Sequence, residues 1–183
     1  SDDMAWIFHA PLEVALGLRE GRDCPPSKIE TKPAARLLEG PLYELRIYQA
    51  SEGRFQHLIK RFREHTDRIF KKHGLNALGY WTPTDGSVKK RRKFVYLLQH
   101  PSRYEAYRNW TNFFNDKEWE RVMDKPEFQG LLSEKPTSIF LSPNDYSAVA
   151  RNDIEKPGGS FELRTYVVNP GKLPMLNARF RKH

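Results

Sequence analysis

A repeated segment constrains the fold of this chain more than any other feature of its sequence. The segment 43–48, "YELRIY", recurs near the C-terminus as 161–166, "FELRTY". Later residues recur at the same constant offset: Gly53 as Gly171, Arg61-Phe62 as Arg179-Phe180, and His65 as His183. Because the spacing is kept without a gap, both copies are expected to encode the same strand and the helix that follows it.

The first copy combines the alternation of a strand with the periodicity of a helix. Tyr43, Leu45 and Ile47 alternate with more polar residues, which predicts a half-buried strand. After Gly53, apolar residues recur at three- and four-residue steps, which predicts a helix with one apolar face. Gly74 is suited to end this helix. The apolar positions of the helix are Phe55, Leu58, Ile59, Phe62, Ile69, Phe70 and His73.

The segments that follow complete a βαββαβ order. Further strands are predicted over 75–82, 94–99 and 137–141, and a second helix over 103–123 with a break near Asn115-Asp116. This order is that of a ferredoxin-like α+β domain. The apolar face of the second helix is expected to comprise Tyr104, Tyr107, Trp110, Phe113, Phe114, Trp119 and Val122.

The chain is expected to have four parts. Residues 1–40 read as an N-terminal extension or arm, and residues 41–142 as the ferredoxin-like domain. Residues 143–160 form a linker rich in proline and glycine. Residues 161–183 are a partial second repeat, a strand plus the start of a helix. In the arm, Trp6 and Phe8 are interface candidates, because they have little core of their own to enter; the alternative is a loosely held tail.

A four-stranded sheet with both helices on one face leaves its other face bare. If Leu45 and Ile47 point toward the helices, the bare face of the first strand carries Glu44, Arg46 and Tyr48. These three residues are therefore candidates for an interface. We expect a protein partner to cover this face, in a homodimer or a larger hetero-assembly. Arg46 would alternatively clamp an acidic ligand, but cross-strand pairing of Glu44 with Arg46 is favoured.

Basic side chains concentrate in the two repeat copies and in one short run between strands. The chain of 183 residues has a formal net charge of +8, and its longest basic run is Lys89, Lys90, Arg91, Arg92 and Lys93. Such a run suits RNA phosphates or an anionic membrane surface, although a solvated hairpin tip is the commonest alternative. No apolar run approaches the roughly 18 residues typical of a membrane span.

Few residues indicate a disulfide, a metal site or a catalytic site. The single cysteine, Cys24, excludes an internal disulfide. His57, His65 and His73 lie eight residues apart, so successive members turn by about 80° around a helix and share no face. No metal site and no catalytic constellation is predicted.

Five motifs together resemble the NIPSNAP family. They are "YELRIY", "RFREHTDRIFKKHG", "GYWTP", "WTNFFNDKEWERV" and "LSPNDYS", and they occur in this order over 42–147. The later "FELRTYVVNPGKL" fits the two-domain pattern of that family. The resemblance implies a ferredoxin-like domain of the dimeric α/β-barrel type, a mitochondrial location in the matrix or at the inner membrane, and a role in interactions.

The expected function is that of a non-catalytic interaction protein. Its most concrete form is an accessory subunit docked on a larger mitochondrial assembly, such as a respiratory complex or the mitoribosome. The first alternative is a small-molecule monooxygenase or haem-handling enzyme of the same superfamily, with a pocket between sheet and helices into which Arg46 or His65 points. No cofactor is expected outside this alternative, where it would be haem. The second alternative is a peripheral membrane-surface adaptor.

Overall fold

The four predicted strands pair into one antiparallel sheet. In the computed structural model, which describes residues 41–87, 91–147 and 161–182, they are β1 (Leu42–Gln49), β2 (Asn76–Trp81), β3 (Lys93–His100) and β4 (Thr137–Leu141). Their order across the sheet is β2-β3-β1-β4. Each strand lies within about two residues of its predicted bounds, and the ferredoxin-like α+β fold is confirmed.

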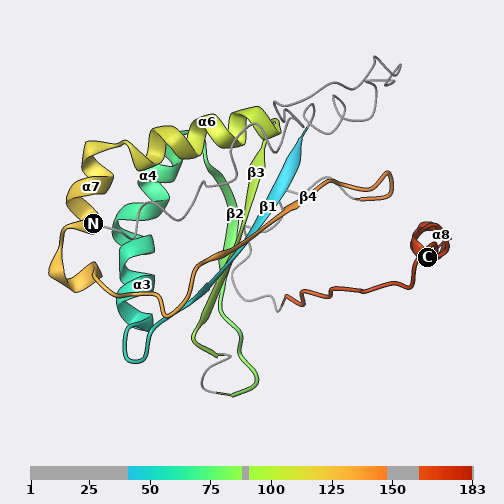
Figure 1. Ribbon diagram of the computed structural model, residues 1–183, viewed down its shortest axis with the longest axis horizontal. Helices are drawn as coiled ribbons and strands as arrows, with labels where there is room; N and C mark the ends of the chain where they lie inside the picture. Colours follow the sequence, from blue (N-terminus) through green and yellow to red (C-terminus); the bar gives the residue numbers. More distant parts are fainter. Residues whose placement is uncertain (1–40, 88–90, 148–160, 183) are drawn as a thin grey trace, which may run out of the picture. The chain divides into compact units, whose positions relative to one another are not determined.

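The helices of this domain lie on one side of the sheet (Figure 1). The first helical segment consists of α3 (Phe55–Arg61), a π-helical turn η2 (Phe62–Thr66) and α4 (Asp67–Lys72). The second consists of α6 (Arg103–Phe114), α7 (Lys117–Met123) and a 3₁₀ turn η3 (Pro126–Phe128). The opposite face of the sheet carries no helix among the described residues up to 142.

The break between α6 and α7 lies where the sequence predicts it, because side-chain caps fix both helix starts. The hydroxyl of Ser102 accepts a hydrogen bond from the Glu105 backbone N–H and begins α6. Asp116 accepts from the Glu118 backbone N–H at 2.7 Å and begins α7. At the end of α4, Gly74 has a φ of +71°, which a residue with a side chain adopts only at a cost.

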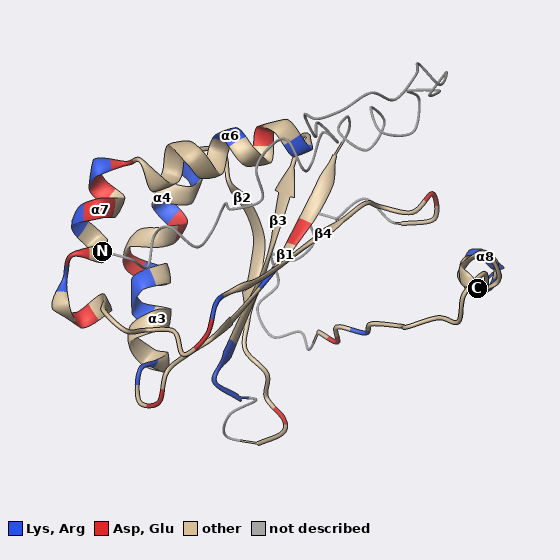
Figure 2. Ribbon diagram, in the orientation of Figure 1, with Lys and Arg blue, Asp and Glu red and all other residues tan. Residues whose placement is uncertain are grey.

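Aromatic rings fill the space between the sheet and the helices. The Phe62 ring meets Tyr48 of β1, Tyr80 of β2 and Phe94 of β3, with ring centroids 4.6–5.8 Å apart. Phe70 continues the cluster toward Trp110 and Phe113 of α6. Lys, Arg, Asp and Glu residues are frequent in the helices and few in the strands (Figure 2). The core is therefore held by burial of aromatic surface.

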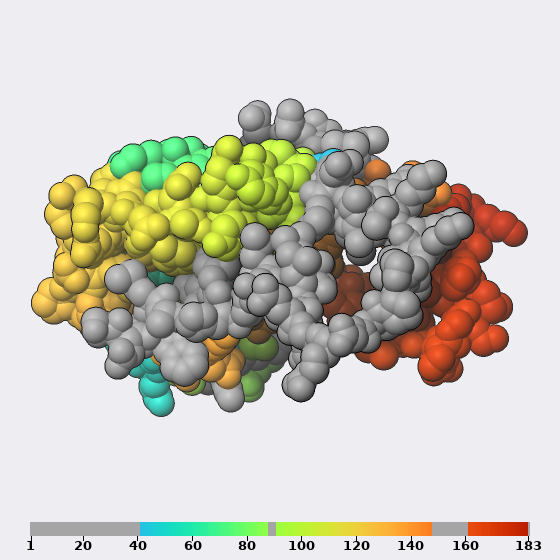
Figure 3. Space-filling view, turned by 45° about the horizontal axis from the view of Figure 1, so that its top comes forward, coloured from blue at the N-terminus to red at the C-terminus, as the bar shows by residue number. Residues whose placement is uncertain are grey.

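Two tyrosines of α6 do not lie where the sequence predicts them. Tyr104 and Tyr107 are 64% and 43% exposed. The segment with α6 and α7 lies at the surface of the molecule, yellow-green to yellow in Figure 3. The buried stripe of α6 runs through Ala106, Trp110 and Phe113 instead. Because a helix turns by about 100° per residue, Tyr104 falls almost opposite that stripe.

The chain divides into two compact units, Ser1–Ser142 and Pro143–His183. In the second unit, helix α8 (Leu173–Lys182) forms, and Arg181 makes two hydrogen bonds of 2.8 Å to Asp145. The predicted strand over 161–166 is wrong, since residues 161–169 are not paired in any ladder. A strand needs a neighbouring strand to satisfy its backbone groups, and alternation alone does not supply one.

Candidate functional site

The polar residues of β1 face the helices, so their predicted place on the bare face is wrong. Glu44, Arg46 and Tyr48 are 1%, 4% and 7% exposed. The indole N–H of Trp110, on α6, donates to a Glu44 carboxylate oxygen at 2.7 Å. Alternation shows that two sets of side chains point in opposite directions, but it does not show which set faces the helices.

Glu44 is the centre of a buried polar network. Arg46 donates to one of its carboxylate oxygens at 3.1 Å, and Ser138 of β4 donates to the same oxygen at 2.6 Å. The other oxygen receives the Trp110 bond and lies 3.1 Å from Nε2 of His100. Glu44 and Arg46 therefore pair within one strand, two residues apart, and not across strands as expected.

The network holds Glu44 in its charged form. Burial alone would raise the pKa of this carboxyl, but the hydrogen bond with His100, the charge of Arg46 and the Ser138 and Trp110 bonds lower it to about 2. Burial would lower the pKa of Arg46, yet Tyr48, Tyr96 and Glu44 raise it above its ordinary value. Glu44 and Arg46 thus form a buried, mutually neutralised ion pair.

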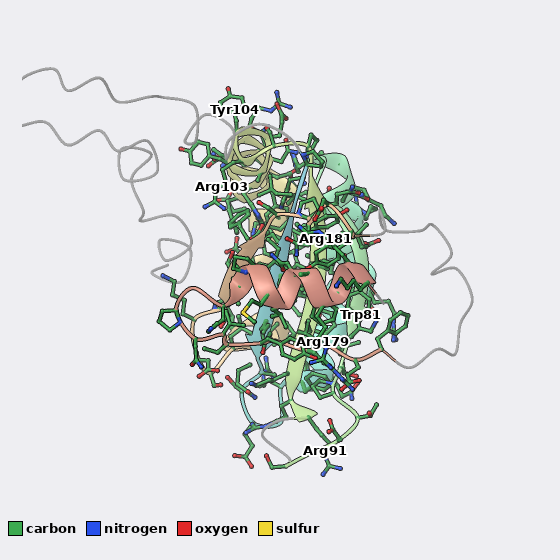
Figure 4. All side chains as sticks on the ribbon, turned by 90° about the vertical axis from the view of Figure 1, so that its right-hand side faces the viewer. Trp81, Arg91, Arg103, Tyr104, Arg179 and Arg181 are labelled. Atoms are coloured by element: carbon green, nitrogen blue, oxygen red, sulfur yellow. The ribbon has the colours of Figure 1, made fainter. Side chains whose placement is uncertain are left out.

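The face of the sheet opposite the helices is apolar. We call it the open face. At its centre Leu45 pairs with Leu97 of β3 and with Ile139 of β4. Trp81 of β2, labelled in Figure 4, lies opposite Val95 on the same face. Ile139 and Leu141, on the edge strand β4, are each 42% exposed. The same side also carries Gln49 opposite Lys93 and Asn76 opposite Gln99 at its ends. The open face comprises Tyr43, Leu45, Ile47, Gln49, Asn76, Trp81, Lys93, Val95, Leu97, Gln99, Thr137, Ile139 and Leu141.

A cavity of about 360 Å³ lies on the helix side of the sheet. Side chains from both helical segments form its walls, and the loop 129–136 before β4 borders it. Gln129, Ser133, Glu134 and Lys135 of that loop are exposed, so the loop marks the side where the cavity meets solvent. The apolar part of its lining is Phe62, Phe70, Trp110, Phe113, Phe114, Trp119, Met123, Phe128, Leu131 and Leu132.

Arg61 is the charged side chain buried in the wall of this cavity. It is the last residue of α3, and the π-helical turn follows it directly. Its guanidinium lies over the rings of Phe62 and Trp119, 5.6 and 5.3 Å from their centroids. Burial lowers its pKa, although the hydroxyls of Tyr48 and Tyr96 act in the opposite direction. The sequence gives one signal for this residue, the repeated pair Arg61-Phe62 and Arg179-Phe180.

The pocket expected by the enzyme alternative therefore exists, but the predicted residues do not line it. Arg46 is sequestered by Glu44, and His65 packs edge-on against Phe128 with its Nε2 3.3 Å from Nζ of Lys125. Burial and the Lys125 charge lower the pKa of His65. An axial ligand of haem must present a free ring nitrogen to the cavity, so this placement of His65 does not fit a haem site.

A second histidine of this helical segment, His73, is also held by the fold. His73 bonds to Asp116, which also pairs with Lys72 at 2.6 Å. These contacts and the Glu118 backbone N–H lower the pKa of Asp116, with Lys72 the largest cause. Within the described ranges, no group of three His, Cys, Asp or Glu side chains is placed to hold a metal ion.

The basic run lies only partly within the described residues. Arg91 is exposed and lies beside the gap between 87 and 91 in Figure 4, whereas Arg92 and Lys93 are half-buried and Lys93 begins β3. Lys89 and Lys90 lie outside the described residues, as do Trp6 and Phe8. In the described part of the chain, no helix is both long and apolar enough to cross a membrane.

Known proteins share this fold. The family model described as NIPSNAP matches residues 43–148. An uncharacterized NIPSNAP domain protein from Burkholderia xenovorans superposes with a TM-score of 0.51 and 18% identity, covering 59% of this chain and 99% of its own. A NIPSNAP family protein from Agrobacterium tumefaciens superposes with a TM-score of 0.52 and 22% identity, covering 58% and 96%.

A comparison with curated proteins gives no match. The two structural likenesses show the fold alone, because their identities are low. The family model covers more than half of the chain, from the first residues of β1 to the segment after β4. The chain belongs to the NIPSNAP family.

Proposed function

We propose that this chain is a non-catalytic interaction protein that binds a partner subunit through the open face. The observation that carries the proposal is the composition of that face. Leu45, Leu97 and Ile139 form one continuous apolar row across three strands. Leu45 is buried in this row, whereas Ile139 and Leu141 at its edge are each 42% exposed, and exposed apolar patches mark interaction sites in soluble proteins.

A second sheet is the partner whose shape fits this surface. Two sheets that pack face to face interdigitate their apolar side chains over a flat area. A second copy of this domain offers such a sheet, and so does another ferredoxin-like domain in a hetero-assembly. The self-complementary arrangement is a two-fold dimer in which the same patch is used twice.

The interior polar residues support an interaction role over catalysis. Glu44 and Arg46 neutralise each other, and their hydrogen bonds to Trp110 and Ser138 leave them out of reach of a substrate. In its most concrete form, the proposal makes the chain an accessory subunit of a mitochondrial assembly. That location rests on the family resemblance, and cell fractionation tests it.

Sedimentation velocity of the full chain tests the interface. We expect the 21.5-kDa chain to sediment as a dimer, and we expect Leu141→Asp or Ile139→Asp to shift it to monomer, because a charge would be buried in the apolar contact. Tyr104→Asp is the matched control, since Tyr104 is also exposed but lies on the helix side. A monomer at every concentration, together with no partner captured from intact cells, would refute the proposal.

Capture of a partner separates the two forms of assembly. A protein cross-linked in intact cells and lost in Leu141→Asp, but kept in Tyr104→Asp, is a hetero-partner of the open face. Cross-links that join only two copies of this chain indicate the homodimer. Binding that both variants keep would place the interaction elsewhere and contradict the proposal.

A further inference from the structure

Two hydrogen-bond donors in the wall of the cavity have no acceptor among the residues that the structure describes. The Nε of Arg61 and the indole Nε1 of Trp119 are buried and make no hydrogen bond within the structure. Both residues line the cavity and both are 5% exposed. Within the described ranges, the Arg61 guanidinium donates to the thioether sulfur of Met123 at 3.4 Å, which is a weak acceptor.

Arg61 also lacks a counter-charge. No described carboxylate forms an ion pair with it, and the groups that favour its charged form are only the hydroxyls of Tyr48 and Tyr96. Arg46, buried to a similar degree in the same core, contacts Glu44 at 3.1 Å. A guanidinium stays protonated in proteins, so an unpaired one in the interior is costly. The fold therefore neutralises one buried arginine and gives the other no counter-charge among the described residues.

We propose that the cavity binds an apolar monocarboxylate, with its carboxylate on Arg61 and Trp119 and its apolar body among the aromatic rings. A carboxylate offers two oxygens in the plane that a guanidinium fork matches. The second donor, Nε1 of Trp119, comes from α7, so the two helical segments hold the same anion. This site does not depend on the open face, which lies on the other side of the sheet.

The walls and size of the cavity select the body of the ligand. Its volume of about 360 Å³ falls in the range of roughly 300–1,000 Å³ that is usual for small-molecule sites. Aromatic and aliphatic side chains provide most of the lining, among them Phe70, Phe128 and Leu131. A phosphate monoester would bring more charge and more acceptor oxygens than these two donors satisfy. An aliphatic or aromatic acid fits the lining.

Arg61 shares the buried face of α3 with Leu58, and the helix changes its winding directly after it. The π-helical turn over Phe62–Thr66 follows Arg61, and it shifts the residues on either side relative to a regular α-helix. Thr66, which lines the same cavity, donates from its hydroxyl to the Arg61 carbonyl at 3.2 Å. Turns of this type occur frequently at functional sites.

Titration of the full chain with decanoate tests the site. We expect saturable binding, which Arg61→Gln weakens about tenfold to a hundredfold because a charge-assisted bond is lost. Trp119→Phe keeps the ring and removes only the N–H, so we expect a smaller loss. Arg63→Gln removes the same charge from an exposed position on the same helical segment and is expected to bind like wild type. Decan-1-ol, which lacks the carboxylate, is expected to bind weakly and to be insensitive to Arg61→Gln.

A spectroscopic readout keeps the test independent of variant stability. In ¹H–¹⁵N spectra, the indole signal that Trp119→Phe removes is expected to shift when decanoate binds to wild type. Leu141→Asp is expected to leave decanoate binding unchanged. No saturable binding up to about 1 mM, an unmoved Trp119 signal, or loss of binding in Leu141→Asp would each overturn the proposal, the last because it places the ligand on the open face.

Discussion

The Glu44 network gives a sharp prediction for stability and its pH dependence. The pKa of Glu44 falls from its usual 4.5 to about 2 in the folded chain. A shift of this size corresponds to about 3 kcal/mol of stabilisation. Because the folded pKa is lowered, this contribution is present in full above pH 4.5 and is lost as the pH falls toward 2.

Replacing Glu44 by Gln removes the charge and leaves Arg46 buried without its partner. We expect a loss of about 3–5 kcal/mol in the free energy of unfolding at pH 7. The amide also brings a donor to positions where Trp110 and Ser138 donate. As the pH falls from 4.5 to 2, wild type loses the stabilisation from charged Glu44. The difference in the free energy of unfolding between wild type and Glu44→Gln should therefore narrow by about 2–3 kcal/mol.

Urea denaturation at pH 7, 4 and 2.5, followed by far-ultraviolet circular dichroism, measures both quantities. Glu120→Gln is the control, because Glu120 forms an exposed ion pair with Lys117 and should contribute less than about 1 kcal/mol. If Glu44→Gln does not fold at pH 7, Ser138→Ala removes a single bond to Glu44 and should cost about 1–3 kcal/mol. The reasoning would be refuted if Glu44→Gln lowered the free energy of unfolding by less than about 1 kcal/mol, or if its difference from wild type did not change with pH.

Further variants test other parts of the fold. Gly74→Ala and Gly53→Ala should each lower the free energy of unfolding by about 1–2 kcal/mol, because both glycines have positive φ. The loss should be larger for Gly74→Ala, since a Cβ there would lie 2.9 Å from the Asn109 amide, whereas nothing lies within 4 Å at Gly53. Equal losses in urea denaturation would contradict this. Asp116→Ala should cost about 1–2 kcal/mol at pH 7 through loss of the α7 cap and the Lys72 pair, and since the pKa of Asp116 is lowered, the difference from wild type should shrink as the pH falls below 3.8. A difference that is unchanged with pH would show that the charge of Asp116 is not involved.

The sequence predicted the positions of the helices and strands better than it predicted which side of each faces the core. The order of strands and helices followed from periodicity, and the break before α7 followed from Asn115-Asp116. The orientation of β1 did not, because Leu45 and Tyr48 are both suited to burial. Contacts with the helices decide which side faces them, such as those of Glu44 with Trp110 and of Tyr48 with Phe62. Long-range contacts of this kind leave no local pattern.

The sequence predicted that a pocket could lie between the sheet and the helices, but it did not predict which residues line it. A pocket between sheet and helices was an expectation of the enzyme alternative, yet Arg61 was missed in favour of Arg46 and His65. Arg61 lies three residues after Leu58 in α3, so helical spacing puts it on the same buried face, but a charged residue type predicts a solvent position and hid this. The repeated Arg-Phe pair was the one available signal, and its meaning depends on the three-dimensional structure.

Footprinting of the open face tests the central proposal most directly. A photoactivated carbene reagent labels exposed side chains of the full chain, and labelling of Ile139 and Leu141 is compared with that of Tyr104 over a range of protein concentrations. The proposed assembly predicts that Ile139 and Leu141 become protected as concentration rises or a captured partner is added, while Tyr104 does not. Labelling of all three residues that stays unchanged under both conditions would contradict a role for the open face.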